Sequence, residues 1–314
     1  MTYQPFGINL PVVRYVESGR GTGRVRGTSI WGGTGGIWQD GPVPDRRRHR
    51  GAHPKDAECF ASVELPRLRR AAEDLGWLLS RGYPGKAAVQ MVGDRYALRA
   101  RQRMAIRRAT VGEPTRAARA RRQVGSAALR GRVLLVDGYN VLLTVETALG
   151  GGVVLASRDG VYRDMASMRR HYKRVTQTRP ALEAIGSWLA AAQCREVAWY
   201  LDRPISNSGR LKKWMEEVAA DCGWPWTVEL VASPDRVLAG SREIVATADG
   251  WILDQCRSWV NLARRVVDGA VPQAWVVDLS GTCLGEEPTG ANFDTLGDGG
   301  SGRQDSGDPR DVHG

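Results

Sequence analysis

Residues 133–142 read VLLVDGYNVL, an unbroken apolar run that ends at Asp137 and is followed by a glycine and a second apolar run. A short apolar run closed by turn residues is typical of a strand buried on both faces of a parallel sheet. Comparable runs occur at residues 197–202, 226–232, 243–249 and 274–279. These five segments are the predicted strands.

Segments with helical spacing separate these strands. Apolar residues recur at every third or fourth position after Pro180, after Ser208 and from Ile252 to Leu262, and a further helix is predicted at residues 160–174. Alternation of strand and helix indicates a parallel sheet with helices on both faces. We therefore predict an α/β domain over residues 132–280.

The sequence before this domain is strongly basic. Residues 41–132 carry 22 Lys and Arg against 8 Asp and Glu, a net charge of +14, whereas residues 133–280 carry 17 of each. Leucines spaced helically from Leu65 to Leu79 predict a helix. We expect a small basic all-α domain at residues 41–111, joined by a linker at 112–131 to the α/β domain.

The two ends of the chain lack hydrophobic periodicity. Residues 1–40 are rich in Gly and residues 281–314 in Gly, Asp and Ser, so a disordered arm and a disordered acidic tail are expected. Whether residues 1–40 belong to the native protein is left open. No apolar window approaches the ~18 residues of a membrane helix and the start lacks a signal-peptide pattern, so a cytoplasmic protein with no membrane partner is expected. Five scattered cysteines and four histidines argue against a disulfide frame or a zinc site.

Three aspartates end predicted strands. Asp137, Asp202 and Asp249 each take the last position of an apolar run. The carboxyl ends of parallel strands form one rim, where ligands bind, so these side chains should meet there. An all-oxygen acid cluster suits Mg²⁺ or Mn²⁺. For each aspartate taken singly, a helix N-cap or a surface ion pair is the alternative role.

Three motifs carry a resemblance to known nucleases. LLVDGYNVL resembles the first motif of the PIN-like nucleases, in particular of their NYN branch. VATADGWIL is similar to that superfamily's late Thr-x-Asp motif, and YLDRPISN occupies the place of its middle strand acid. The resemblance covers about residues 131–280. It implies a metal-dependent nuclease with a parallel sheet flanked by helices.

The same resemblance implies roles for individual residues. Asp137, Asp202 and Asp249 would be catalytic and hold the metal, and Asn140 would orient ligands or phosphate. Family members usually add a fourth acid from a helix after the first strand. The candidate here is Asp164, with Asp159 and Glu146 as competitors.

The whole chain also resembles a two-domain family, domain of unknown function 434 followed by domain of unknown function 5616. GPVPDRRR, DLGWLLSRGY and MVGDRYALRARQR carry the first resemblance, and VDGYNVLLTVETAL and LDRPISNSGRLK carry the second. Together they span residues 41–280. This resemblance brings no established activity.

Basic and polar side chains are the expected contacts to phosphate. A polyanion is the natural partner of a domain with a charge of +14, and basic residues at the start of the helix from Ser208 point the same way. A solvated arginine-rich surface is the alternative. The residues predicted to contact nucleic acid are Asn140, Asn207, Ser208, Arg210, Lys212, Arg46, Arg47, Arg81, Arg95, Arg99, Arg101 and Arg103.

The sequence therefore predicts a nuclease that uses Mg²⁺ or Mn²⁺ to hydrolyse phosphodiester bonds, with RNA expected over DNA. The alternative is a non-catalytic RNA- or ribosome-binding protein on a PIN-like fold, and a nucleotide-binding regulatory fold is a third, more remote reading. The natural substrate, the endo or exo polarity and the presence of a homo-oligomer are not decided by the sequence.

Overall fold

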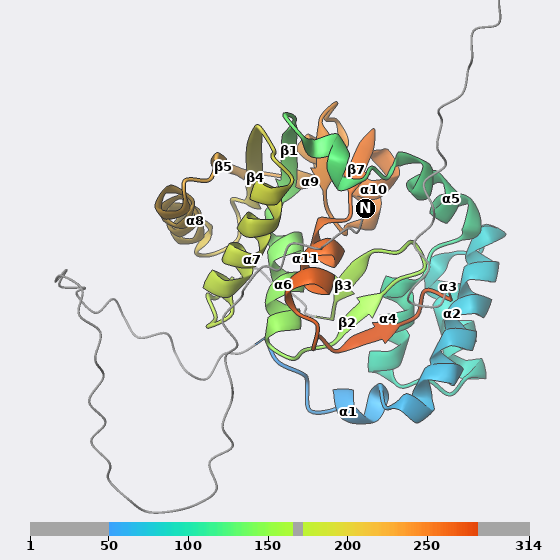
Figure 1. Ribbon diagram of the computed structural model, residues 1–314. Helices are drawn as coiled ribbons and strands as arrows, with labels where there is room; N and C mark the ends of the chain where they lie inside the picture. The colour runs from blue at the N-terminus through green and yellow to red at the C-terminus, as the bar shows by residue number, and fades with distance from the viewer. Residues whose placement is uncertain (1–49, 166–171, 282–314) are drawn as a thin grey trace, which may run out of the picture. The chain divides into compact units, whose positions relative to one another are not determined.

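Five parallel strands form the central sheet of the computed structural model, which describes residues 50–165 and 172–281 (Figure 1). Their order across the sheet is β5-β4-β1-β6-β7. The strands are β1 (Val133–Asp137), β4 (Glu196–Asp202), β5 (Trp226–Val231), β6 (Ile244–Ala246) and β7 (Ser258–Val260). The predicted α/β class and parallel sheet are confirmed. Since β1 lies between β4 and β6, its carboxyl end borders both neighbours.

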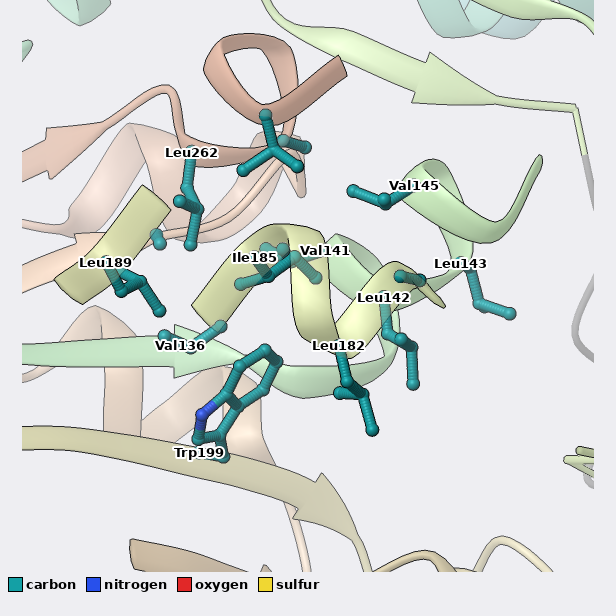
Figure 2. Close-up of a cluster of buried hydrophobic side chains, with 14 of the residues drawn as sticks. Val136, Val141, Leu142, Leu143, Val145, Leu182, Ile185, Leu189, Trp199 and Leu262 are labelled. Carbon is teal, nitrogen blue, oxygen red and sulfur yellow. The ribbon is translucent and has the colours of Figure 1, made fainter. Parts of the chain in front are cut away.

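Helices cover both faces of this sheet. They are α6 (Gly138–Leu149), α7 (Thr178–Ala191), α8 (Ser208–Cys222), α9 (Pro234–Ala239), α10 (Gly250–Gln255) and α11 (Leu262–Ala270). Side chains alternate along β1, so Leu134 and Val136 face the core under α6, α7, α8 and α11, whereas Leu135 faces α9 and α10. Figure 2 shows Val136 and Trp199 of the sheet together with Leu182 and Ile185 of α7 in the first core.

A second, three-stranded sheet has the order β3-β2-β8. It contains β2 (Val154–Ala156), β3 (Tyr162–Asp164) and β8 (Val276–Asp278), with β2 antiparallel to β3 and parallel to β8. The helix predicted at residues 160–174 is therefore wrong where β3 lies. The Asp159-Gly160 pair is a hairpin signal, and Gly160 has the positive φ of +77° that such a turn requires.

Two other element predictions need correction. The predicted strand 274–279 belongs to the second sheet, as β8, rather than to the central one. The helix predicted from Ile252 to Leu262 is divided into α10 and α11 by β7. Helical spacing alone misassigned this segment because Trp259 is buried although it lies in strand β7, which pairs with β6.

The basic region before β1 is helical, as predicted. Its elements are α1 (Asp56–Cys59), η1 (Ser62–Glu64), α2 (Leu65–Ser80), α3 (Gly85–Arg95), α4 (Ala100–Ala109), α5 (Glu113–Arg122) and η2 (Ser126–Leu129). The segment 112–131, predicted as a linker, contains α5 and η2. Leu68, Leu75 and Ile106 share a core with Leu155 and Val277 of the second sheet. This shared core places the junction of α4 and α5 beside the second sheet (Figure 1).

Some predictions concern residues outside this description. The arm at residues 1–40, nearly all of the tail at 281–314, and Arg46 and Arg47 lie beyond the described residues. Within residues 50–165 and 172–281, no helix combines the length and apolar character needed to cross a membrane.

Candidate functional site

The three predicted aspartates line one pocket. Asp137 and Asp202 are the last residues of β1 and β4, and Asp249 follows β6 by three residues as the N-cap of α10. All three border a cavity of about 560 Å³ at the carboxyl end of the sheet. The rule that parallel strands share a ligand edge therefore places these carboxylates correctly in space.

Two more carboxylates line the same cavity. Asp235, in the first turn of α9, was not predicted, although it follows β5 closely enough that the strand-end rule applied to that strand would have found it. Asp164, the candidate fourth acid, lies on β3 rather than on a helix, and its Oδ2 is 3.4 Å from the Thr144 hydroxyl. The cavity therefore has carboxylates on both sheets.

The competitors for the fourth acid have structural roles away from the cavity lining. Asp159 is fully buried and pairs with Arg119 at 2.6 Å and Arg163 at 2.7 Å. Glu146 is also fully buried, where its carboxylate accepts a hydrogen bond from Tyr172 at 2.5 Å and pairs with Arg50. Both acids are neutralised inside the protein.

Asp137 is the most perturbed acid of the group. Its side chain is 7 % exposed, and the Thr247 hydroxyl donates to its Oδ2 at 2.7 Å. Burial raises the pKa of Asp137 to about 7, and the negative charges of Asp249, Asp235 and Asp202 contribute to the rise although the Thr247 hydrogen bond opposes it. Near neutral pH this position therefore favours either a proton or a nearby cation.

The pKa values of Asp202 and Asp235 are shifted in the same direction. Burial raises the pKa of Asp202, and the charge of Asp235 adds to the effect. Burial likewise raises the pKa of Asp235, together with the charge of Asp249. The carboxylates thus sense one another across the cavity, which is the electrostatic condition for cation binding.

The loop that carries Asp249 is tightly held. The backbone N–H of Asp249 donates to the Thr247 hydroxyl at 3.0 Å, and the Ala248 N–H donates to Asn140 Oδ1 at 2.9 Å. Asp249 Oδ1 accepts from the N–H groups of Trp251 and Ile252 at 2.8 and 3.1 Å, so Asp249 also has the N-cap role considered as its alternative. Asn140, predicted to orient ligands, fastens this loop to α6.

A buried ion network supports the same loop from behind. Arg163 Nε donates to the Ala248 carbonyl at 2.9 Å, and Arg119 Nη2 donates to the Gly250 carbonyl at 2.9 Å. Asp159 lies between the two guanidinium groups. Its burial alone would raise its pKa, but the charges of Arg163 and Arg119 lower the pKa to about 2. Arg119 of α5 thereby links the helical region to the position of Asp249.

A close contact with β4 explains why the residue after Asp137 is a glycine, Gly138. A Cβ at this position would lie 2.9 Å from the Tyr200 carbonyl and 2.5 Å from Leu201 Cδ2. The start of α6 therefore packs directly on the backbone of β4, which brings the ends of β1 and β4 together.

The cavity lining includes four arginines that were not among the predicted site residues. They are Arg107, Arg108, Arg119 and Arg163. Arg108 lies 3.8 Å from the Asp164 carboxylate and donates to the Asp164 carbonyl at 2.6 Å. Arg107 is exposed and has no hydrogen-bond or ion-pair partner among the described residues. In a region so rich in arginine, only packing shows which side chains face the cavity.

Most of the arginines of the helical region that were predicted to contact nucleic acid form ion pairs with acids. The ion pairs are Arg95 with Asp74 at 3.5 Å, Arg99 with Glu58 at 2.6 Å, Arg103 with Asp94 at 2.8 Å, and Arg101 with Asp56. Arg81 stacks on Trp77, with its guanidinium carbon 3.5 Å from the ring centroid. None of these five residues lines the acidic cavity.

The predicted contacts at the start of α8 also lie outside the cavity lining. Asn207 has a φ of +70° and donates to the Tyr172 carbonyl at 3.1 Å. Ser208 donates to the Arg203 carbonyl at 3.2 Å, and Lys212 pairs with Glu216 at 3.2 Å. Arg210 is exposed.

The acids do not form a closed metal cage. In the described part of the chain, no group of three or more His, Cys, Asp or Glu side chains is arranged so that it could hold a metal ion as it stands. Mg²⁺ usually binds through one or two carboxylates and keeps several waters, with substrate phosphate completing its shell. Asp137 with Asp249 or Asp202 could serve as such an incomplete set.

Two family models match consecutive parts of the chain. Residues 67–122 match the model of a protein of unknown function (DUF434), and residues 126–265 match that of a domain of unknown function (DUF5616). The DUF434 match is followed along the chain by the DUF5616 match. The DUF434 region spans most of the basic helices, and the DUF5616 region contains the central sheet and all five cavity aspartates.

The chain is similar to the uncharacterized protein MJ0935 of Methanocaldococcus jannaschii. The two are 28 % identical over 186 residues, which are 59 % of this chain and 88 % of the relative. No solved structure matches the chain. These comparisons do not confirm the PIN-like resemblance. Residues from both matched regions line the cavity, since Arg107, Arg108 and Arg119 lie in the DUF434 region.

Proposed function

We propose that this protein is a metal-dependent nuclease that hydrolyses phosphodiester bonds, with RNA as its expected substrate. The observation that carries the proposal is the buried carboxylate of Asp137, which lines one cavity together with four further aspartates. Two carboxylates about 4 Å apart repel by about 4 kcal/mol at an effective dielectric of ~20. Several carboxylates in one crevice are therefore most stable when a bound cation offsets their repulsion.

The donor set fits a hard divalent cation. Every candidate ligand is a carboxylate oxygen, and no His or Cys lines the cavity in the described residues. Oxygen-only sites select Mg²⁺ or Mn²⁺ over zinc. Asp137, Asp202 and Asp249 are the residues proposed to hold the ion. A bound Mg²⁺ or Mn²⁺ lowers the pKa of a coordinated water and offsets the charge on the leaving oxygen.

The chain's own residues position these groups. Thr247 holds Asp137 through its hydroxyl and also receives the N–H of Asp249, so one side chain fixes the spacing of two acids. Asn140, Arg163 and Arg119 hold the backbone on both sides of Asp249. The acids are therefore set on a rigid rim before substrate arrives, which reduces reorganisation during the reaction.

The test is cleavage of labelled RNA and DNA by the full chain with Mn²⁺, Mg²⁺ or EDTA. We expect metal-dependent RNA cleavage that is abolished by Asp137→Asn and retained by Asp221→Asn, a matched control at an exposed position on α8. Calorimetric titration of Mn²⁺ should show binding to the parent and to the control, and weakened binding to Asp137→Asn. Equal cleavage by Asp137→Asn and the parent would contradict the proposal.

The second candidate function is non-catalytic RNA or ribosome binding. It is favoured by the lack of a closed three-ligand site in the described residues together with the basic helical region. Its signature is RNA binding by the parent that is unaffected by EDTA and by Asp137→Asn, with no cleavage of any RNA or DNA tested.

A further inference from the structure

Two of the aspartates that line the cavity are each followed, two residues later, by an exposed apolar side chain. Asp249 is followed by Trp251 on α10, and Asp235 is followed by Val237 on α9. The side chain of Trp251 is 52 % exposed and that of Val237 is 38 % exposed. The other large apolar side chains that are exposed in the described residues lie in the helical region before β1. In the described α/β domain, such side chains therefore belong to the two helices that carry cavity acids.

The backbone of Trp251 lies directly beside the cavity. Its N–H donates to Asp249 Oδ1 at 2.8 Å, and Gly250, the residue between them, lines the cavity. The Cα–Cβ bond of a helical residue tilts toward the start of its helix. The start of α10 is the end that borders the cavity. The indole ring is therefore held at the edge of the cavity, next to a proposed metal ligand, although it is not part of the cavity lining.

The position of Trp251 is fixed by the packing of its helix. Ile252 and Leu253, the next two residues, are fully buried and share a core with Leu238 of α9. The helices α9 and α10 pack against each other (Figure 1). An indole that stays half exposed forgoes part of the stabilisation that burial of its large apolar surface would bring. A ligand that covers the ring would recover this stabilisation.

Continuity with the proposed metal site indicates what this ligand is. When a phosphodiester is bound by a cation on Asp249, the nucleotides on either side of it leave the cavity over its edge, where Trp251 lies. Bases of single strands stack on exposed aromatic rings, and every base can do so because each has a π-face. A base inside a duplex is already stacked on its neighbours, so the ring selects an unpaired base.

We propose that Trp251 is a stacking platform for one unpaired nucleobase of a single-stranded substrate, next to the phosphate that the acids hold. The platform takes its substrate from the proposed nuclease function, but stacking requires no cleavage. It narrows the substrate class to single-stranded nucleic acid, including the unpaired loops of a folded RNA.

The test measures binding of the full chain to a fluorescent single-stranded RNA oligonucleotide by anisotropy, in EDTA and in Ca²⁺. Trp251→Ala should weaken binding about 5- to 150-fold, the usual effect of removing one base–aromatic stack. Trp251→Phe keeps an aromatic ring and should retain most of the affinity, whereas Trp251→Leu keeps apolar surface without a ring and should lose it. Trp77→Ala is the matched control, because Trp77 is 53 % exposed and lies outside the cavity lining.

Stability measurements separate a ligand role from a structural one. All variants at this position keep the backbone N–H that Asp249 accepts, and the side chain that they replace is half exposed. Their urea unfolding midpoints should therefore equal that of the parent. Lost affinity with retained stability supports the platform, whereas unchanged affinity in Trp251→Ala overturns it.

Modified RNAs show whether the ring meets a base. In a series of oligonucleotides that each lack one base, one position should weaken binding to the parent but not to Trp251→Ala, because both changes delete the same contact. The same loss in the parent and in Trp251→Ala at every position would overturn the platform. So would an effect of Trp251→Ala that is equally large for a blunt duplex of the same RNA.

The remaining outcomes separate the platform from the nuclease. Equal losses in Trp77→Ala and Trp251→Ala, or no binding of the RNA by the parent, would overturn the platform. Binding that follows the expected pattern without cleavage in Mn²⁺ would refute the nuclease and leave the platform standing. Metal-dependent cleavage and binding that are both unchanged in Trp251→Ala would refute the platform and leave the nuclease standing.

Discussion

Replacing Asp137 by Asn should stabilise the metal-free protein at alkaline pH. The asparagine oxygen can still accept the Thr247 hydrogen bond, so the main change is the loss of a buried negative charge. Burial and three neighbouring aspartates raise the pKa of Asp137 to about 7 in the folded chain, against an ordinary value of 3.8. That difference corresponds to an upper bound of about 4 kcal/mol in the free energy of unfolding.

The raised pKa of Asp137 determines whether the stability of the parent rises or falls with pH. Protonated Asp137 contributes no penalty below about pH 4, and the parent loses stability as the pH rises from there through 7, where the carboxylate forms in the folded state. The asparagine variant has no such loss. Its advantage over the parent should therefore be near zero at about pH 4 and largest at about pH 8.

Urea unfolding of both proteins in EDTA at about pH 4.5 and pH 8 measures this difference. Asp221→Asn serves as the control, because this exposed residue should give the same stability difference at both pH values. Addition of Mn²⁺ at pH 8 should stabilise the parent more than Asp137→Asn, since an ion that binds only the folded state adds to its stability. A stability difference between Asp137→Asn and parent that does not change with pH would refute the electrostatic argument.

Two further predictions concern the framework of the site. Asp159→Asn leaves the buried guanidinium groups of Arg119 and Arg163 without their shared counter-charge, so urea unfolding should show a loss of about 3–5 kcal/mol, and an unchanged midpoint would contradict the role of this network. Gly138→Ala places a methyl group 2.9 Å from the Tyr200 carbonyl, a backbone atom that cannot move aside easily, and thermal unfolding should reveal a destabilisation of about 1–3 kcal/mol. A stability equal to the parent's would show that the contact between the start of α6 and β4 is loose.

Much of the candidate site follows from local sequence. The apolar run before Asp137 predicts a buried parallel strand, and the rule that such strands share a ligand edge is sufficient to bring Asp137, Asp202 and Asp249 to one cavity. The sequence also shows Gly138 directly after Asp137. It does not show why a glycine is needed there, because the carbonyl that Gly138 contacts lies on β4. A buried strand can be recognised from its own residues, whereas a contact between two segments depends on how the chain folds.

Other features were decided by packing between distant segments. The sequence predicted a helix where β3 lies, because a three-residue strand has too few residues to show its period and owes its stability to pairing with β2. Arg107 reaches the cavity only through the core shared by the helices and the second sheet. Apolar patterning and the distribution of charge along the sequence predicted that this chain joins a basic helical region to an α/β domain with acids at its strand ends. Tertiary structure selected, among many similar arginines, those that face these acids, because side chains on a helix are equivalent until one face is buried.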